Sequence, residues 1–131
     1  MEETIFTKII KGEIPSHKVY EDDKTLAIVD IYPIQPGMVL VLAKPQVDHL
    51  WDLSEEDYAA LMATVRKVGQ RLREAFPEKK RVGIIVEGFE VPHAHVKVFP
   101  IDNGNEVRAM PSTKEPDHAV FADLAKRLAF Q

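Results

Sequence analysis

Two histidines and a lysine alternate with small apolar residues between positions 91 and 100, in the stretch VPHAHVKVFP. Side chains two positions apart in a strand point the same way, so His93, His95 and Lys97 should lie in a row, roughly 6.5–7 Å apart. A neutral imidazole is a competent nucleophile at phosphorus, and a neighbouring ammonium can stabilise the oxygens of the transition state. These residue types at this spacing therefore predict an anion site suited to phosphoryl or nucleotidyl chemistry.

Two other interpretations compete with this one. The first is a solvated strand face without a function, since exposed alternation is common in strands. The second is a metal site, because two imidazoles on one face can share an ion. A zinc site needs a third ligand, however, and protonated Lys97 would repel the cation. His17, His49 and His118 show no ligand-like spacing, so we expect no metal ion and no cofactor.

Length and composition narrow the class of protein. The chain has 131 residues, no cysteine and a formal net charge of −4. The length predicts a single domain over 1–131, and the acidic charge does not favour nucleic acid or an anionic membrane as partner. We see neither a signal peptide nor a run of the roughly 20 apolar residues that spans a bilayer. The expected location is the cytoplasm.

The motif needs neighbouring elements to position it, and the first half of the chain predicts a short helix and three strands. Apolar residues recur at helical spacing over 4–11, with Thr4 as a possible cap and Gly12 just past the end. Strands are predicted over 18–21, 25–31 and 38–43. Short turns between them favour an antiparallel meander, with the nearly all-apolar third strand in the centre.

The second half predicts one long helix and two more strands. The helix begins after Ser54, carries a single apolar stripe and closes at Pro77. A strand over 82–86 and the motif strand over 91–100 are separated by only a short loop, which favours antiparallel neighbours. The extension 101–131 is predicted to be irregular up to about 115 and helical over 116–130. We predict an α+β fold in which the long helix covers one sheet face and the motif's polar side chains occupy the other.

The motif resembles the histidine triad motif, His-φ-His-φ-His-φ-φ, in which φ is apolar. Further segments resemble the same superfamily, in the same order and at similar spacing. They are FTKIIKGEIP at 6–15, VYEDD at 19–23, LAIVDIYP at 26–33, Pro36-Gly37, and 44–54. Because the ordered match runs from about residue 5 to residue 100, the chain is identified as a member of the histidine triad superfamily.

This resemblance implies a five-stranded protomer, commonly one half of a homodimer, whose partner molecule is a nucleotide or nucleoside phosphoramidate. Members hydrolyse or transfer nucleoside monophosphates through a covalent nucleotidyl-histidine. His95 maps to the nucleophile. His93 maps to the histidine that helps hold its imidazole and also contributes to the substrate site, as Lys97 does. Asp30 maps to the acidic residue that binds the ribose hydroxyls, and Ile31 to a wall of the base pocket. Lys97 occupies the position of the third histidine, near the phosphate and the leaving group.

The sequence departs from the family pattern at four places. Lys97 replaces the third histidine, and an ammonium with an ordinary pKa near 10.4 is a poor proton donor at neutral pH. Met38 replaces a further histidine after the Pro-Gly turn. The loop 87–90, Glu-Gly-Phe-Glu, is shorter than the glycine-rich loop that normally reaches the phosphates, and its carboxylates would repel them. The zinc ligands of some bacterial members are replaced by Thr4, Thr7 and Gln46.

We therefore predict a purine nucleoside phosphoramidate or dinucleoside polyphosphate hydrolase that acts through His95, with slow or altered chemistry. The charge of Lys97 is expected to keep the imidazole of His95 neutral by repulsion. Nucleotidyl transfer is one alternative, because a neutral side chain replaces the third histidine in the transferase branch of the superfamily. A non-catalytic nucleotide-binding dimer is the other.

Overall fold

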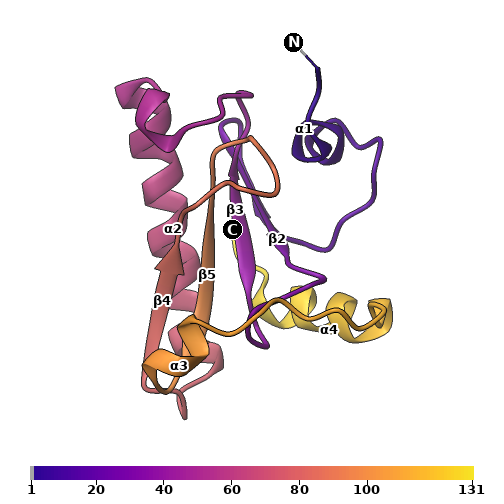
Figure 1. Cartoon of the computed structure of the whole chain (residues 1–131), viewed down its shortest axis with the longest axis vertical. Coiled ribbons are helices and arrows are strands. Elements are labelled where there is room, and N and C mark those ends of the chain that lie inside the picture. The colour runs from indigo at the N-terminus through magenta and orange to yellow at the C-terminus, as the bar shows by residue number, and fades with distance from the viewer. Residues whose placement is uncertain (1) are drawn as a thin grey trace.

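The computed structural model, which describes residues 2–131, contains a five-stranded antiparallel sheet with helices on both of its faces (Figure 1). The strands are β1 (Lys18–Glu21), β2 (Thr25–Val29), β3 (Val39–Ala43), β4 (Arg81–Ile85) and β5 (His95–Ile101). The helices are α1 (Ile5–Ile10), α2 (Glu55–Ala75), α3 (Gly104–Val107) and α4 (His118–Leu128), with a 3-10 turn over Leu50–Asp52. The α+β class and the number of strands are as predicted.

The strand order β1-β2-β3-β5-β4 places the apolar strand β3 in the middle of the sheet. The first three strands form the predicted meander, and β4 pairs antiparallel with β5. Every residue of β2, β3 and β5 is buried, so both faces of the central sheet must be covered. The motif strand is therefore held between β3 and β4, in the most constrained part of the fold.

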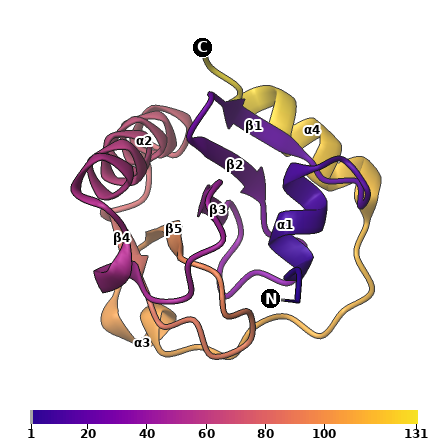
Figure 2. The ribbon, with the colours of Figure 1, turned by 90° about the horizontal axis from the view of Figure 1, so that it is seen from above.

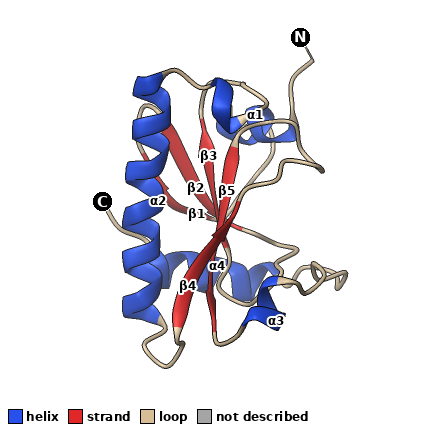
Figure 3. Ribbon diagram, turned by 60° about the vertical axis from the view of Figure 1, so that its left-hand side comes forward, coloured by secondary structure: helices blue, strands red, loops and turns tan. Residues whose placement is uncertain are grey.

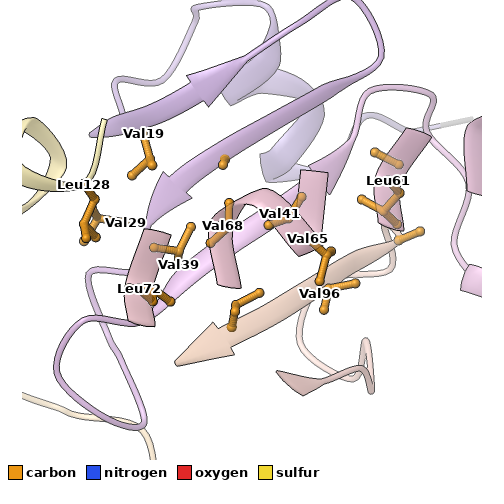
Figure 4. Close-up of a cluster of buried hydrophobic side chains, with 14 of the residues drawn as sticks. Val19, Val29, Val39, Val41, Leu61, Val65, Val68, Leu72, Val96 and Leu128 are labelled. Carbon is orange, nitrogen blue, oxygen red and sulfur yellow. The ribbon is translucent and has the colours of Figure 1, made fainter. Parts of the chain in front are cut away.

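The two faces of the sheet are covered by different helices. α2 and α4 contribute to the apolar cluster on one face, where Val41 and Val96 of the strands meet Leu61 and Val68 of α2 (Figure 4). On the opposite face, Phe6 and other residues of α1 join a second cluster. Figures 2 and 3 show α1 and α2 on opposite sides of the sheet. The short helix predicted near the N-terminus thus becomes the cover of the face that carries the motif.

The predicted motif strand needs one correction at each end. β5 begins at His95 rather than at 91, because the backbone N–H of His93 bonds to the Val91 carbonyl in a tight turn after Pro92. It continues through Pro100 to Ile101 because both residues pair with β4. Pairing with β3 has already ended at Val98. Beyond Val98 the β3 side of β5 is open, and a residue without an N–H is tolerated there.

The extension 101–131 is more ordered than predicted. Asn103 accepts a hydrogen bond from the backbone N–H of Glu106 and starts the short helix α3, in a stretch predicted to be a loop. Asp117 caps α4, a helix predicted over 116–130, and the structure packs it against the sheet. Within residues 2–131, no helix combines the length and the apolar character required to cross a membrane.

Candidate active site

His95 opens β5 and is held by a backbone carbonyl. Its Nδ1 lies 2.6 Å from the carbonyl oxygen of His93. Because a carbonyl oxygen only accepts hydrogen bonds, Nδ1 must carry the proton. The neutral ring therefore has its lone pair on Nε2, which is the atom required of a nucleophile. The ring of Phe6 from α1 packs edge-on against it, with centroids 4.8 Å apart.

The surroundings of His95 keep its ring neutral. Burial lowers the pKa of His95, and the charge of Lys97 lowers it further, although the hydrogen bond to His93 and the charges of Glu87 and Asp30 act in the opposite direction. The charge of Lys97 acts in the predicted direction, but burial is the larger cause. A neutral imidazole at physiological pH is what nucleophilic attack requires.

His93 is fully buried, and both of its ring nitrogens have partners in the protein. Its Nε2 lies 2.6 Å from the Ala43 carbonyl oxygen and must donate to it, while Nδ1 accepts from the hydroxyl of Thr4 at 2.8 Å. Burial lowers the pKa of His93 as well. Its ring does not line the cavity described below, so this geometry favours a positioning role for His93 over the substrate contact implied by the resemblance. That role is carried by its carbonyl, which holds His95.

Thr4, Thr7 and Gln46 come together beside His93, as expected from their positions in the family pattern. Gln46 Oε1 accepts from the Thr7 hydroxyl at 2.6 Å and from the Thr4 backbone N–H at 3.1 Å. Hydroxyls and an amide are poor zinc ligands compared with thiolate and imidazole. Residues 2–131 include no group of three or more His, Cys, Asp or Glu side chains placed to hold a metal ion. The set fits a hydrogen-bond network better than a zinc site.

Lys97 is 7% exposed and pairs with Glu87, with 3.1 Å between Nζ and Oε1. The register explains the pairing: Lys97 is opposite Ile85 at the end of β4, and Glu87, two residues further, faces the same side. Burial favours the protonated form of Glu87, but the hydrogen bond and charge of Lys97 prevail and lower its pKa. An ion pair therefore occupies the position of the third histidine.

A cavity of about 540 Å³ lies between α1 and the sheet and brings most of the predicted site together. His95, Lys97, Asp30 and Ile31 all line it. The buried side chains of His95 and Lys97 contradict the interpretation of the motif as a solvated strand face. Phe6 contributes to the apolar part of the same cavity.

Asp30 lies just past the end of β2, not inside the strand that was predicted to reach residue 31. One carboxylate oxygen accepts from the backbone N–H of Tyr32 at 2.8 Å. Burial raises the pKa of Asp30, while this hydrogen bond and the charge of Lys97 act against the shift. The carboxylate is therefore fixed at the wall of the cavity, and its second oxygen is available to a hydroxyl donor.

The cavity also has lining residues that sequence reasoning missed. His17 and His118 lie 101 positions apart, yet their Nε2 and Nδ1 atoms are 2.9 Å from one another, and both residues line the cavity. Glu90 lines it too. No local pattern links His17 to His118, because only the packing of α4 against β1 brings them together.

Comparison with known proteins places these observations in a family context. The model of the HIT domain matches residues 11–104. "Protein hit" of Bacillus subtilis is 30% identical, over 98% of this chain and 96% of that protein. Adenosine 5'-monophosphoramidase hnt1 of Schizosaccharomyces pombe is 35% identical, over 76% of this chain and 74% of that protein. The crystal structure of a Hit-like protein from Bartonella henselae superposes with a TM-score of 0.84 at 29% identity, covering 96% of this chain and 93% of that one.

Proposed function

Because this chain belongs to the HIT domain family, we propose that it is a nucleotide hydrolase whose nucleophile is Nε2 of His95. The observation that carries the proposal is the tautomer of this ring: Nδ1 donates to the His93 carbonyl, so Nε2 is unprotonated in a cavity shared with Lys97 and Asp30. The similarity to an adenosine 5'-monophosphoramidase supports a purine nucleoside 5'-phosphate derivative as substrate.

Two steps account for hydrolysis. In the first, His95 Nε2 attacks the phosphorus, the new P–N bond forms, and the bond to the leaving group breaks with its electron pair on that group, which takes a proton from water. In the second, water attacks the same phosphorus and loses a proton, the P–N bond to His95 breaks, and a nucleoside monophosphate is released. The neutral imidazole is restored at the end.

The other cavity residues have supporting roles in this scheme. The ammonium of Lys97 lies beside His95 and can stabilise the negative charge on the phosphoryl oxygens in both transition states. Asp30 can accept hydrogen bonds from the ribose hydroxyls, and Ile31 and Phe6 provide apolar contacts for the base. His93 fixes the orientation and the tautomer of His95 through its carbonyl.

The test measures, by chromatography, the release of AMP from adenosine 5'-phosphoramidate. We expect His95→Ala to lower kcat by about 10³-fold or more, because the covalent intermediate can no longer form. His49→Ala is the matched control, since His49 is an exposed histidine outside the cavity, and it should leave the rate unchanged. Retention of AMP binding by His95→Ala, measured by calorimetry, would show that the variant is folded.

Other results would lead to a different function. A nucleotidyl adduct that disappears in His95→Ala, without net release of AMP by the unmodified protein, would indicate transfer to a second substrate. Nucleotide binding that survives His95→Ala, with no turnover of phosphoramidate or dinucleoside polyphosphate, would indicate a binding protein. Full AMP release by His95→Ala would exclude His95 as the nucleophile.

A further inference from the structure

The cavity has an unusual distribution of charge for a site that handles phosphates. Among its described lining residues Lys97 is the only lysine or arginine, and its ammonium is already paired with Glu87 at 3.1 Å. Asp30 and Glu90 add two further carboxyl groups to the wall. Phosphate groups in proteins are usually bound by several cations or N–H donors. Of lysine and arginine side chains, the described lining of this cavity therefore offers one shared cation for the phosphoryl group that reacts, and no second one for a further phosphate.

The leaving group can be placed from the function proposed above. When the phosphorus of a nucleotide faces His95, its leaving group lies near Lys97, the next residue of β5 that lines the cavity. Glu90, which is exposed, lines the cavity, and Glu87, whose side chain is 26% exposed, is bonded to Lys97 in the cavity wall. A leaving group would thus meet carboxylates before it reached solvent.

On the basis of the function proposed above, we propose that Glu87 determines leaving-group specificity, favouring amines and disfavouring phosphates. An amine that leaves phosphorus takes a proton and departs as a neutral or cationic group, which the carboxylates of Glu87 and Glu90 attract. A phosphate leaves as an anion, which the same carboxylates repel and which finds no free cation. The substrate class is then a nucleoside phosphoramidate of an amine, not a dinucleoside polyphosphate.

Glu87 acts on specificity in two ways that can be separated by substitution. Its own charge repels an anionic leaving group, and its bond to Lys97 draws the ammonium away from that group. Glu87→Gln removes the charge at nearly constant shape and releases the ammonium to bind a second phosphate. Glu87→Asp keeps the charge and should keep the specificity. Glu78→Gln is the control, because Glu78 is an exposed glutamate outside the cavity.

The experiment compares the binding of AMP and ADP by calorimetry, since the second phosphate of ADP occupies the place of an anionic leaving group. We expect the unmodified protein and Glu78→Gln to bind AMP about tenfold more tightly than ADP, roughly what one unfavourable charge contact contributes. Glu87→Gln should remove most of this preference, and Glu87→Asp should retain it. The ratio of kcat/KM for adenosine 5'-phosphoramidate over diadenosine triphosphate should change in the same direction.

The outcomes separate this inference from the function on which it rests. Equal affinity of the unmodified protein for AMP and ADP, or a preference unchanged by Glu87→Gln, would overturn the role of Glu87 even where His95-dependent hydrolysis is observed. A preference lost in Glu87→Gln would support the role of Glu87 even if the protein binds nucleotides without hydrolysing them. If neither nucleotide binds, both the function and the inference fail.

Discussion

His93 and His95 are fixed in opposite tautomers, because each has one ring nitrogen 2.6 Å from a backbone carbonyl. His95 donates from Nδ1 and has its lone pair on Nε2, whereas His93 donates from Nε2 and accepts from Thr4 through Nδ1. The two residues of one His-x-His pair therefore do different work. In the proposed function, His95 reacts through Nε2 and the carbonyl of His93 holds its ring in place.

The pH dependence of kcat/KM tests the environment of His95. Burial and the charge of Lys97 lower the pKa of His95, so the reactive neutral ring should persist to lower pH than in a free histidine. The acid limb of the kcat/KM profile reports this pKa in the free enzyme. We expect its midpoint below about 6.5, the ordinary value for histidine.

Two substitutions should move this midpoint in opposite directions. Lys97→Met removes a charge that lowers the pKa of His95, so the acid limb should shift to higher pH. Glu87→Gln removes a charge that raises the same pKa, so the limb should shift to lower pH. The position of the limb is compared, not the height of the profile, because both substitutions also affect phosphate binding. Shifts of the same sign would contradict the assignment of these charges.

Residue alternation predicted that His93, His95 and Lys97 would share one face. His95 and Lys97 do line one cavity, but His93 precedes the strand and its ring does not line that cavity. Alternation could not predict that this face is buried, since the cover comes from Phe6 of α1, far away in the chain. The ion pair between Lys97 and Glu87 could not be predicted from the sequence either. It depends on the register of β4 against β5 and on the path of the short loop that contains Glu87.

At the scale of elements, prediction succeeded where the apolar periodicity agrees with the residues that cap helices and form turns. The meander β1-β2-β3 and the long helix α2 have clear turns, caps and apolar periods, and each was found close to its predicted bounds. Two of the errors fall where side chains bond to nearby backbone: Asp30 ends β2 early, and Asn103 starts α3 in a predicted loop. Such local bonds compete with regular structure and leave no periodic signal.

Substitutions at three glycines can distinguish the contribution of backbone conformation to stability from that of packing. Gly37 has φ +88°, and an added Cβ would lie 3.0 Å from the ring of Phe76 at the end of α2. Gly12 has φ +83° after α1, but nothing lies within 4 Å of its added Cβ. Gly69 is an ordinary helical residue of α2 with open space. Both φ values above +80° disfavour alanine, and only Gly37 adds a steric contact.

Alanine substitution should therefore give a graded series in the free energy of unfolding, measured by urea denaturation. We expect Gly69→Ala to stabilise the protein by about 0.5–1 kcal/mol. Gly12→Ala should destabilise it by roughly 1 kcal/mol, the usual cost of left-handed backbone for a side chain. Gly37→Ala should be the most destabilising, by about 2 kcal/mol or more, since strain and overpacking add. Equal effects at Gly12 and Gly37 would show that Phe76 moves aside freely.

At the scale of the whole molecule, the two edges of the sheet differ in their side chains. β1 has Lys18 and Glu21 at its ends, joined by an ion pair of 2.9 Å. β4 has Ile84, 49% exposed, and the adjoining Val86 is 41% exposed. An unpaired strand with exposed apolar side chains is a site where another chain can add to the sheet. We propose that β4, with the neighbouring surface of α2, is the contact of the homodimer expected from the family resemblance.

Sedimentation equilibrium at micromolar concentration tests this proposal. The unmodified protein should be a dimer, and Ile84→Lys should be a monomer, because two copies of the new charge would meet across the edge. Val120→Lys is the matched control: Val120 is an apolar residue of α4, 57% exposed and far from β4 in the fold. It should remain a dimer. Both lysines are placed on the surface, so both variants should keep the far-ultraviolet circular dichroism of the parent. A dimer that survives Ile84→Lys but dissociates with Val120→Lys would move the contact to α4.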